Sequence, residues 1–70
     1  MPDPVELLLT AADETSLRAA ISYAGGYERA IRKLFDEAYR LQVHGGSHEE
    51  ILAHVDCCDR IDALVRQRRR

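Results

Sequence analysis

Two adjacent glycines, Gly45 and Gly46, separate two amphipathic segments and restrict how these segments can be arranged. Ser47 follows immediately and Glu50 lies three residues further on, which is the pattern of a capping box at the start of a helix. So short a connection makes the helices on its two sides antiparallel neighbours. The sequence therefore predicts a helical hairpin whose turn is this glycine pair.

Both segments repeat apolar residues at the helical period. From Tyr27 to Leu41 the apolar positions are spaced by four, three, four and three residues, and after the glycine pair they recur every three or four residues. Each segment thus forms one apolar face. The residues that we expect in the core or at an interface are Ile31, Leu34, Leu41, Ile51, Val55, Ile61 and Val65.

The N-terminal segment has its own start and stop signals. Asp3 can cap a helix, and Gly25-Gly26 can end one because glycine readily takes the left-handed cap conformation. Polar residues 13–16 interrupt the apolar stripe between these points. Either the helix continues with these residues on its exposed side, or it breaks there and restarts. We expect one helix over residues 4–24, kinked near residue 13.

The expected fold is all-α, a small three-helix bundle built on the hairpin, with helices at about residues 4–24, 27–43 and 47–68. We expect a single domain over residues 1–70, frayed at 1–3 and 69–70. A chain of this length buries only about 60% of its unfolded surface, so its stability is marginal without added contacts. Self-association would supply them, and we expect a homo-oligomer.

Composition removes several classes of protein. The net charge of −2 excludes a globally basic nucleic-acid binder, although it leaves a local basic patch open. Adjacent helical residues point about 100° apart, so Cys57 and Cys58 are poorly placed for a disulfide with each other. With no recognisable signal peptide and no apolar run near the roughly 20 residues of a membrane span, we expect a cytoplasmic protein without a membrane partner.

One turn of the last segment could offer metal ligands. His54 is followed by Cys57 at the third position and Cys58 at the fourth, and imidazole with thiolate suits zinc or copper. A site needs three or four ligands, so the others would come from the glycine turn or a second subunit. The alternative, which we favour, is that Cys58 is a small buried apolar residue with His54 half exposed beside it. We therefore expect no metal and no cofactor.

Catalysis by either cysteine would need a lowered thiol pKa and a nearby base. His54 is close in sequence, but Asp56, Asp59 and Asp62 surround the cysteines, and negative charge disfavours the thiolate. No phosphate-binding loop or dinucleotide fingerprint is present. We expect that the protein is not an enzyme.

The arginines at the C-terminal end could instead bind nucleic-acid phosphates. Basic residues 29, 32, 33 and 40 could extend such a patch on the neighbouring helix. The alternative is a helix end whose dipole favours positive charge, and five acidic residues share the same helix. The candidates for phosphate contact are Arg66, Arg68, Arg69 and Arg70.

Two short stretches resemble known families. GYERAIRKLFDE at 26–37 resembles the first core helix of copper-sensing repressors, and His48 then falls where those proteins carry a metal-binding cysteine. CDRIDALV at 58–65 is similar to a helix of small sporulation aspartyl-phosphate phosphatases, with Cys58 in place of a serine and Asp62 matching an aspartate. Both matches fall on the same hairpin, which generic amphipathic patterning accounts for, so no residue role is carried over.

The sequence thus favours a non-enzymatic helical interaction or regulatory protein of the adaptor type. It would bury an apolar helix face against another protein or a second copy of itself. Two alternatives stay open: a nucleic-acid-binding regulator that uses the C-terminal arginines, and a metal-responsive protein that uses His54 with Cys57 or Cys58.

Overall fold

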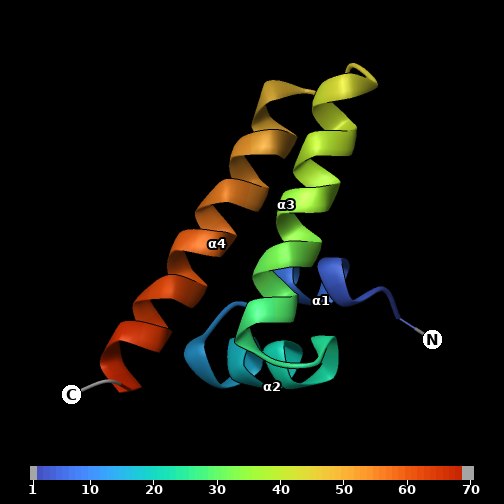
Figure 1. Ribbon diagram of the computed structural model, residues 1–70. Coiled ribbons are helices and arrows are strands. Elements are labelled where there is room, and N and C mark those ends of the chain that lie inside the picture. Colours follow the sequence, from blue (N-terminus) through green and yellow to red (C-terminus); the bar gives the residue numbers. More distant parts are fainter. Residues whose placement is uncertain (1, 69–70) are drawn as a thin grey trace.

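The computed structural model describes residues 2–68, and over that range the chain contains helices and no strand (Figure 1). The expectation of an all-helical bundle is confirmed for this part of the chain. The four helices are α1 (Pro4–Thr10), α2 (Glu14–Ala24), α3 (Tyr27–Val43) and α4 (His48–Arg68).

The expectation of one continuous helix over residues 4–24 was wrong. The chain breaks after Thr10, and α2 restarts behind Asp13, whose backbone is extended. The Asp13 side chain accepts a hydrogen bond from the backbone N–H of Ser16 at 2.7 Å, which caps the first turn of α2. At the other side of the break, the Thr10 hydroxyl donates to the Glu6 carbonyl at 2.8 Å. The polar run is therefore a stop and a new start.

This break lets α1 and α2 fold back on each other as a short antiparallel pair. Their far ends meet where the Tyr23 hydroxyl donates to the Pro2 carbonyl at 3.0 Å. The carbonyl of Ala11, which the break leaves without a helical partner, accepts from the Arg60 guanidinium of α4 at 3.1 Å. The Arg60–Ala11 bond therefore holds the connection between α1 and α2 against α4, while the Tyr23–Pro2 bond holds the other ends of α1 and α2 together.

Helices α3 and α4 are antiparallel and joined by residues 44–47; they lie close together near this turn and diverge toward the other end (Figure 1). Gly45 takes a positive φ of 77°, which glycine adopts without strain. The Ser47 side chain accepts from the backbone N–H of Glu50 at 3.1 Å and donates to the Glu50 carboxylate at 3.2 Å. These contacts fix the turn and the start of α4.

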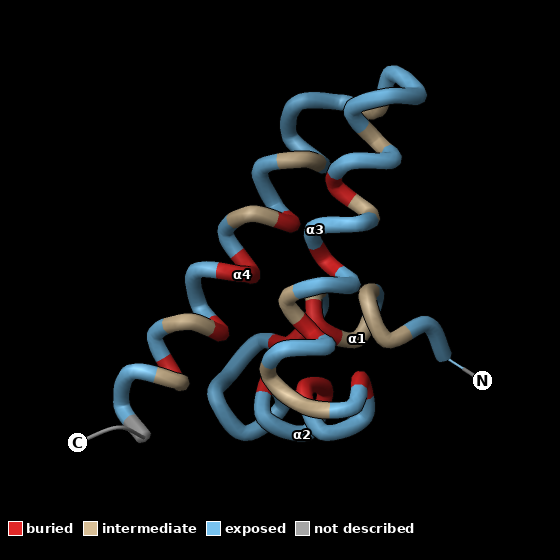
Figure 2. Tube along the Cα trace, in the orientation of Figure 1, coloured by how far each residue is buried: buried red, intermediate tan, exposed pale blue. Residues whose placement is uncertain are grey.

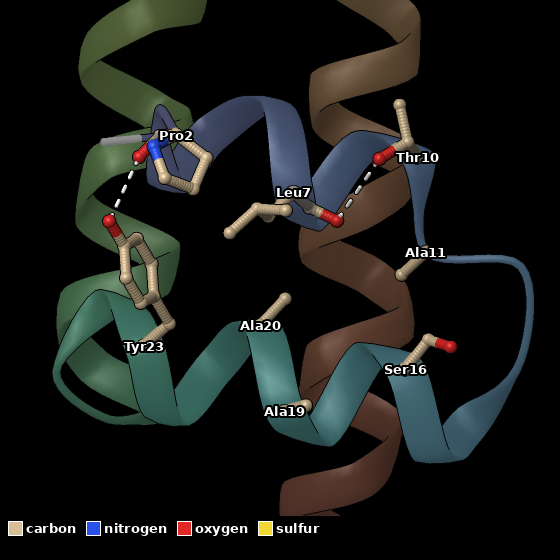
Figure 3. A pocket seen from close by; sticks show the side chains of 8 residues that line it. All are labelled: Pro2, Leu7, Thr10, Ala11, Ser16, Ala19, Ala20 and Tyr23. Atoms are coloured by element: carbon tan, nitrogen blue, oxygen red, sulfur yellow. Dashed lines mark hydrogen bonds between the residues drawn. The ribbon is translucent and has the colours of Figure 1, made fainter.

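Both short helices pack on the same face of the α3/α4 hairpin. The Cys57 thiol of α4 donates to the Leu8 carbonyl of α1 at 3.4 Å, and the Arg60–Ala11 bond lies one turn further along. Seen from the side of α1 and α2, both larger helices lie behind them (Figure 3). Within residues 2–68 no helix lies against the opposite face of the hairpin, and we call it the uncovered hairpin face.

The buried residues lie where these layers face one another (Figure 2), and about half of them are alanine or cysteine. Among the side chains that the structure describes, the large ones that are completely buried are Leu8, Leu34 and Ile61. No aromatic residue is buried: Phe35, Tyr23 and Tyr39 are exposed, and Tyr27 is half-buried. The other buried apolar residues are Ala11, Leu17, Ala20, Ile21, Ala24, Ala30, Ala38, Cys57, Cys58 and Leu64.

We expect Gly25→Ala to lower the free energy of unfolding by about 1–2 kcal/mol, because Gly25 has a φ of 105° that alanine adopts only with strain. Urea denaturation followed by circular dichroism measures the change. Gly25→Asn is the control and should cost less, since asparagine tolerates this conformation better. Equal losses for the two variants would contradict this explanation.

A second prediction concerns pH. The backbone N–H of Ser16 holds the pKa of the Asp13 carboxyl below its usual value, so folding favours the charged form. The stabilisation is complete above the ordinary aspartate pKa of about 3.9 and is lost as pH falls through the lower folded value. The difference in melting temperature between wild type and Asp13→Ala should therefore shrink in acid. A difference that grew in acid would argue against this cap.

Candidate functional site

One surface hollow is a groove of about 440 Å³ between α1 and α2. Its walls are mostly apolar: Leu7 points from α1 toward α2, and Ala20 points back toward it (Figure 3). Its polar atoms are hydroxyls, and those of Tyr23 and Thr10 donate to backbone carbonyls. None of the residues lining this groove carries a carboxylate, amine, imidazole or thiol, so the groove offers no base that could activate its hydroxyls.

The second hollow is a cleft of about 310 Å³ where α1 meets α3 and α4, and it does contain ionisable groups. The Glu37 carboxylate accepts from the Arg40 guanidinium, which is the main reason that the pKa of Glu37 is lowered. A ring nitrogen of His54 lies 2.6 Å from the Glu50 carbonyl oxygen. Since a carbonyl only accepts, this nitrogen carries the proton. The Glu37 carboxylate thus has a hydrogen-bond partner in Arg40, and the His54 ring has one in the backbone carbonyl of Glu50.

His54 was expected to be half exposed, and this was wrong: it is only 6% exposed. It lies beneath α1, among residues of the cleft. Its bond to the carbonyl one turn earlier supplies the polar partner that a buried imidazole needs. The helical period alone places His54 beside the core, but the cover comes from α1, whose direction depends on the break at Asp13.

The two cysteines are buried and point to different helices. The Cys57 thiol faces the Leu8 carbonyl of α1, whereas the Cys58 thiol lies 4.0 Å from the Ile31 carbonyl of α3. Burial is the main cause that raises the pKa of Cys57, and burial with the neighbouring Cys57 and Asp59 raises the pKa of Cys58 to about 11. Both thiols are therefore protonated at neutral pH, which is the wrong state for a nucleophile or a metal ligand.

The metal candidates His54, Cys57 and Cys58 are close in sequence but do not converge on a point. Within residues 2–68 no three His, Cys, Asp or Glu side chains gather as ligands of one ion would. The three side chains instead contact backbone carbonyls on three different helices. In this arrangement the three side chains pack against the backbone of neighbouring turns and helices.

The basic residues are also dispersed. Arg66 pairs with Asp62 at 2.9 Å, and Arg40 pairs with Glu37. Lys33 lies 100° from the buried Leu34 and faces away from α4. Among the candidates for phosphate contact, Arg69, Arg70 and the side chain of Arg68 lie outside the described residues.

The uncovered hairpin face carries the largest exposed apolar side chains of α3. Glu37 borders the cleft under α1, and Phe35, two residues earlier, is turned by about 200° to the opposite side. Phe35 is 53% exposed, and Tyr39, one turn further, is 69% exposed. This pair forms an aromatic ridge with nothing packed over it.

Helix α4 contributes the other half of this face. Val55 lies two residues before Cys57, which points to α1, so Val55 points away from α1. Ile51 is one turn earlier on the same side, and both side chains are half-buried. Together, Phe35, Tyr39, Ile51 and Val55 line the half of the uncovered hairpin face that is nearer the glycine turn.

The residues expected in the core or at an interface divide into two groups. Leu34 and Ile61 are completely buried between the layers. The rest are half-buried: Ile31, Leu41, Ile51, Val55 and Val65. Sequence reasoning missed Tyr39, although its spacing of four residues from both Phe35 and Val43 is a detectable signal.

Comparison with protein-family models, curated proteins and solved structures found no match. Within residues 2–68, no helix combines the length and the apolar character needed to cross a membrane. The function must therefore be argued from the geometry of the chain itself. The uncovered hairpin face is the feature that best suits binding, because its exposed apolar side chains have nothing packed over them.

We expect both thiols to react slowly with a thiol-specific reagent such as iodoacetamide at pH 8. For Cys58, a pKa of about 11 against an ordinary 9.0 predicts roughly a hundredfold less thiolate. The Cys57→Ser and Cys58→Ser variants, read by mass spectrometry, report each thiol separately. Reaction in urea gives the unprotected rate. A cysteine that reacted equally fast in the folded and unfolded protein would contradict its burial.

Proposed function

We propose that this chain is a non-enzymatic helical interaction module that acts, as a homo-oligomer, through the uncovered hairpin face. The observation that carries this proposal is the exposure of Phe35 and Tyr39 on a face that α1 and α2 leave open. Aromatic side chains are enriched where proteins bind one another, because they bury much area and lose little conformational freedom.

The imbalance between core and surface supports this proposal. The core is rich in alanine, while the single phenylalanine is 53% exposed. A chain of 70 residues has little apolar area to spare, so leaving its largest apolar side chains in water forfeits stabilisation. Covering the uncovered hairpin face would recover it.

The chemistry of the described residues favours binding over catalysis. The groove between α1 and α2 has no acidic, basic or thiol side chain among its lining residues, and its Tyr23 hydroxyl donates to the Pro2 carbonyl. In the cleft under α1, Glu37 is engaged by Arg40 and the Thr10 hydroxyl donates to the backbone. The thiols are held protonated by burial. None of these places combines an activated nucleophile with a free base.

We expect Phe35→Ala combined with Tyr39→Ala to break up the oligomer and leave the single chain folded. Both side chains are exposed in the single chain, so their loss removes contacts with a partner and few within the chain. Analytical ultracentrifugation gives the mass, and circular dichroism gives the helix content.

The matched control is Tyr23→Ala, which also truncates an exposed aromatic residue but on α2, away from the uncovered hairpin face. The control should keep the mass of the wild type. If Tyr23→Ala and the double variant changed the mass equally, the uncovered hairpin face would not be the contact. A wild-type protein that remained a monomer at every concentration would overturn the proposed function.

A further inference from the structure

The charged residues beside the uncovered hairpin face form a pattern that can be tested against a second copy. On α3, Arg32 precedes Phe35 by three residues and lies at the edge of the face away from α4. On α4, Asp59 follows Val55 by four residues and lies at the opposite edge. Both side chains are exposed. Neither makes an ion pair with a described residue.

These two charges stand at the same level of the hairpin. The Cys58 thiol lies 4.0 Å from the Ile31 carbonyl, so the neighbouring residues Asp59 and Arg32 are level with each other along the helix axes. Within one chain they are kept apart by the width of the face, because each lies on the outer edge of its own helix. A positive edge and a negative edge thus flank one apolar strip.

Two further charged residues of opposite sign lie nearer the end where α3 begins. Glu28 lies four residues before Arg32 on α3, and Arg66 lies seven residues after Asp59 on α4. The Arg66 guanidinium bonds the Asp62 carboxylate, one turn back along α4, at 2.9 Å. Toward the end where α3 begins, α3 therefore carries Arg32 and then Glu28, whereas α4 carries Asp59 and then the Asp62–Arg66 pair.

A second copy rotated by 180° about an axis parallel to the hairpin can be placed on this face so that the positive edge of each copy lies against the negative edge of the other. The operation lays α3 of one copy over α4 of the other at the same level, so Arg32 meets Asp59 of the second copy. Each contact occurs twice, as in any two-fold interface. Neighbouring helices across the interface run antiparallel, as they do in four-helix bundles.

The exposed area is adequate for such a contact. The chain exposes 5081 Å², whereas a compact monomer of this mass exposes about 4,400 Å². The excess is close to the roughly 800 Å² that each partner contributes to a standard stable interface. A second copy on the uncovered hairpin face would remove an area of this order.

We infer that the occupant of the uncovered hairpin face is a second copy of this chain, docked by this two-fold axis with α3 against the partner copy's α4 and with Arg32 paired to Asp59 at both edges. This inference rests on the proposed function and specifies its partner and geometry. The apolar strip supplies affinity, and the charged edges select one register over the alternative in which α3 lies on α3.

Charge reversal tests the geometry. Arg32→Asp and Asp59→Arg should each raise the dimer dissociation constant roughly tenfold, because each creates two like-charged pairs at the edges. When the two variants are mixed, one chain carries two acidic and the other two basic edge residues. The mixture should therefore form a heterodimer in excess of the statistical half, measured by native mass spectrometry of one isotope-labelled variant.

Lys33→Asp is the control for a charge reversal on α3 away from the face, and it should leave the dissociation constant unchanged. Single variants that dimerise like wild type, or a mixture that gives only the statistical amount of heterodimer, would overturn this docking geometry. The proposed function would survive that result if Phe35→Ala with Tyr39→Ala still abolished association. Absence of a wild-type dimer would overturn both.

Discussion

The antiparallel contact between α3 and α4 is the interaction on which the rest of the fold depends. It is closed at one end by Gly45 and the Ser47 cap, and it sets the level of every residue on one helix against the other, as the approach of Cys58 to Ile31 shows. α1 and α2 are too short to be stable helices alone, and they exist because this hairpin gives them a face to pack on.

As a consequence, one face of the hairpin is covered by other helices and the opposite face is not. One receives α1 and α2, fastened by the bonds from Cys57 to Leu8 and from Arg60 to Ala11. The other face carries Phe35 and Tyr39, aromatic side chains that lie outside the alanine-rich core. In so small a chain, the apolar area exposed on this face is a large share of the total apolar area. This favours the use of the face as an interface.

Much of this arrangement could be predicted from the sequence because it depends on local patterns. The bounds of α3, the cap at Ser47 and the burial of Leu34 and Ile61 follow from spacing and capping chemistry. The break at Asp13 was weighed but not chosen, since a polar run fits both an exposed helix side and a helix start. Its consequences, the burial of His54 and the open face bearing Tyr39, depend on where α1 lies, which no local pattern specifies.

The most direct measurement is the mass of the chain in solution by sedimentation equilibrium over a wide range of concentration. If the hairpin needs a second copy over its open face, the mass should approach twice 7.9 kDa at high concentration and fall on dilution. The melting temperature should fall with it. A constant mass of 7.9 kDa with a concentration-independent melting temperature would show that the hairpin is complete alone.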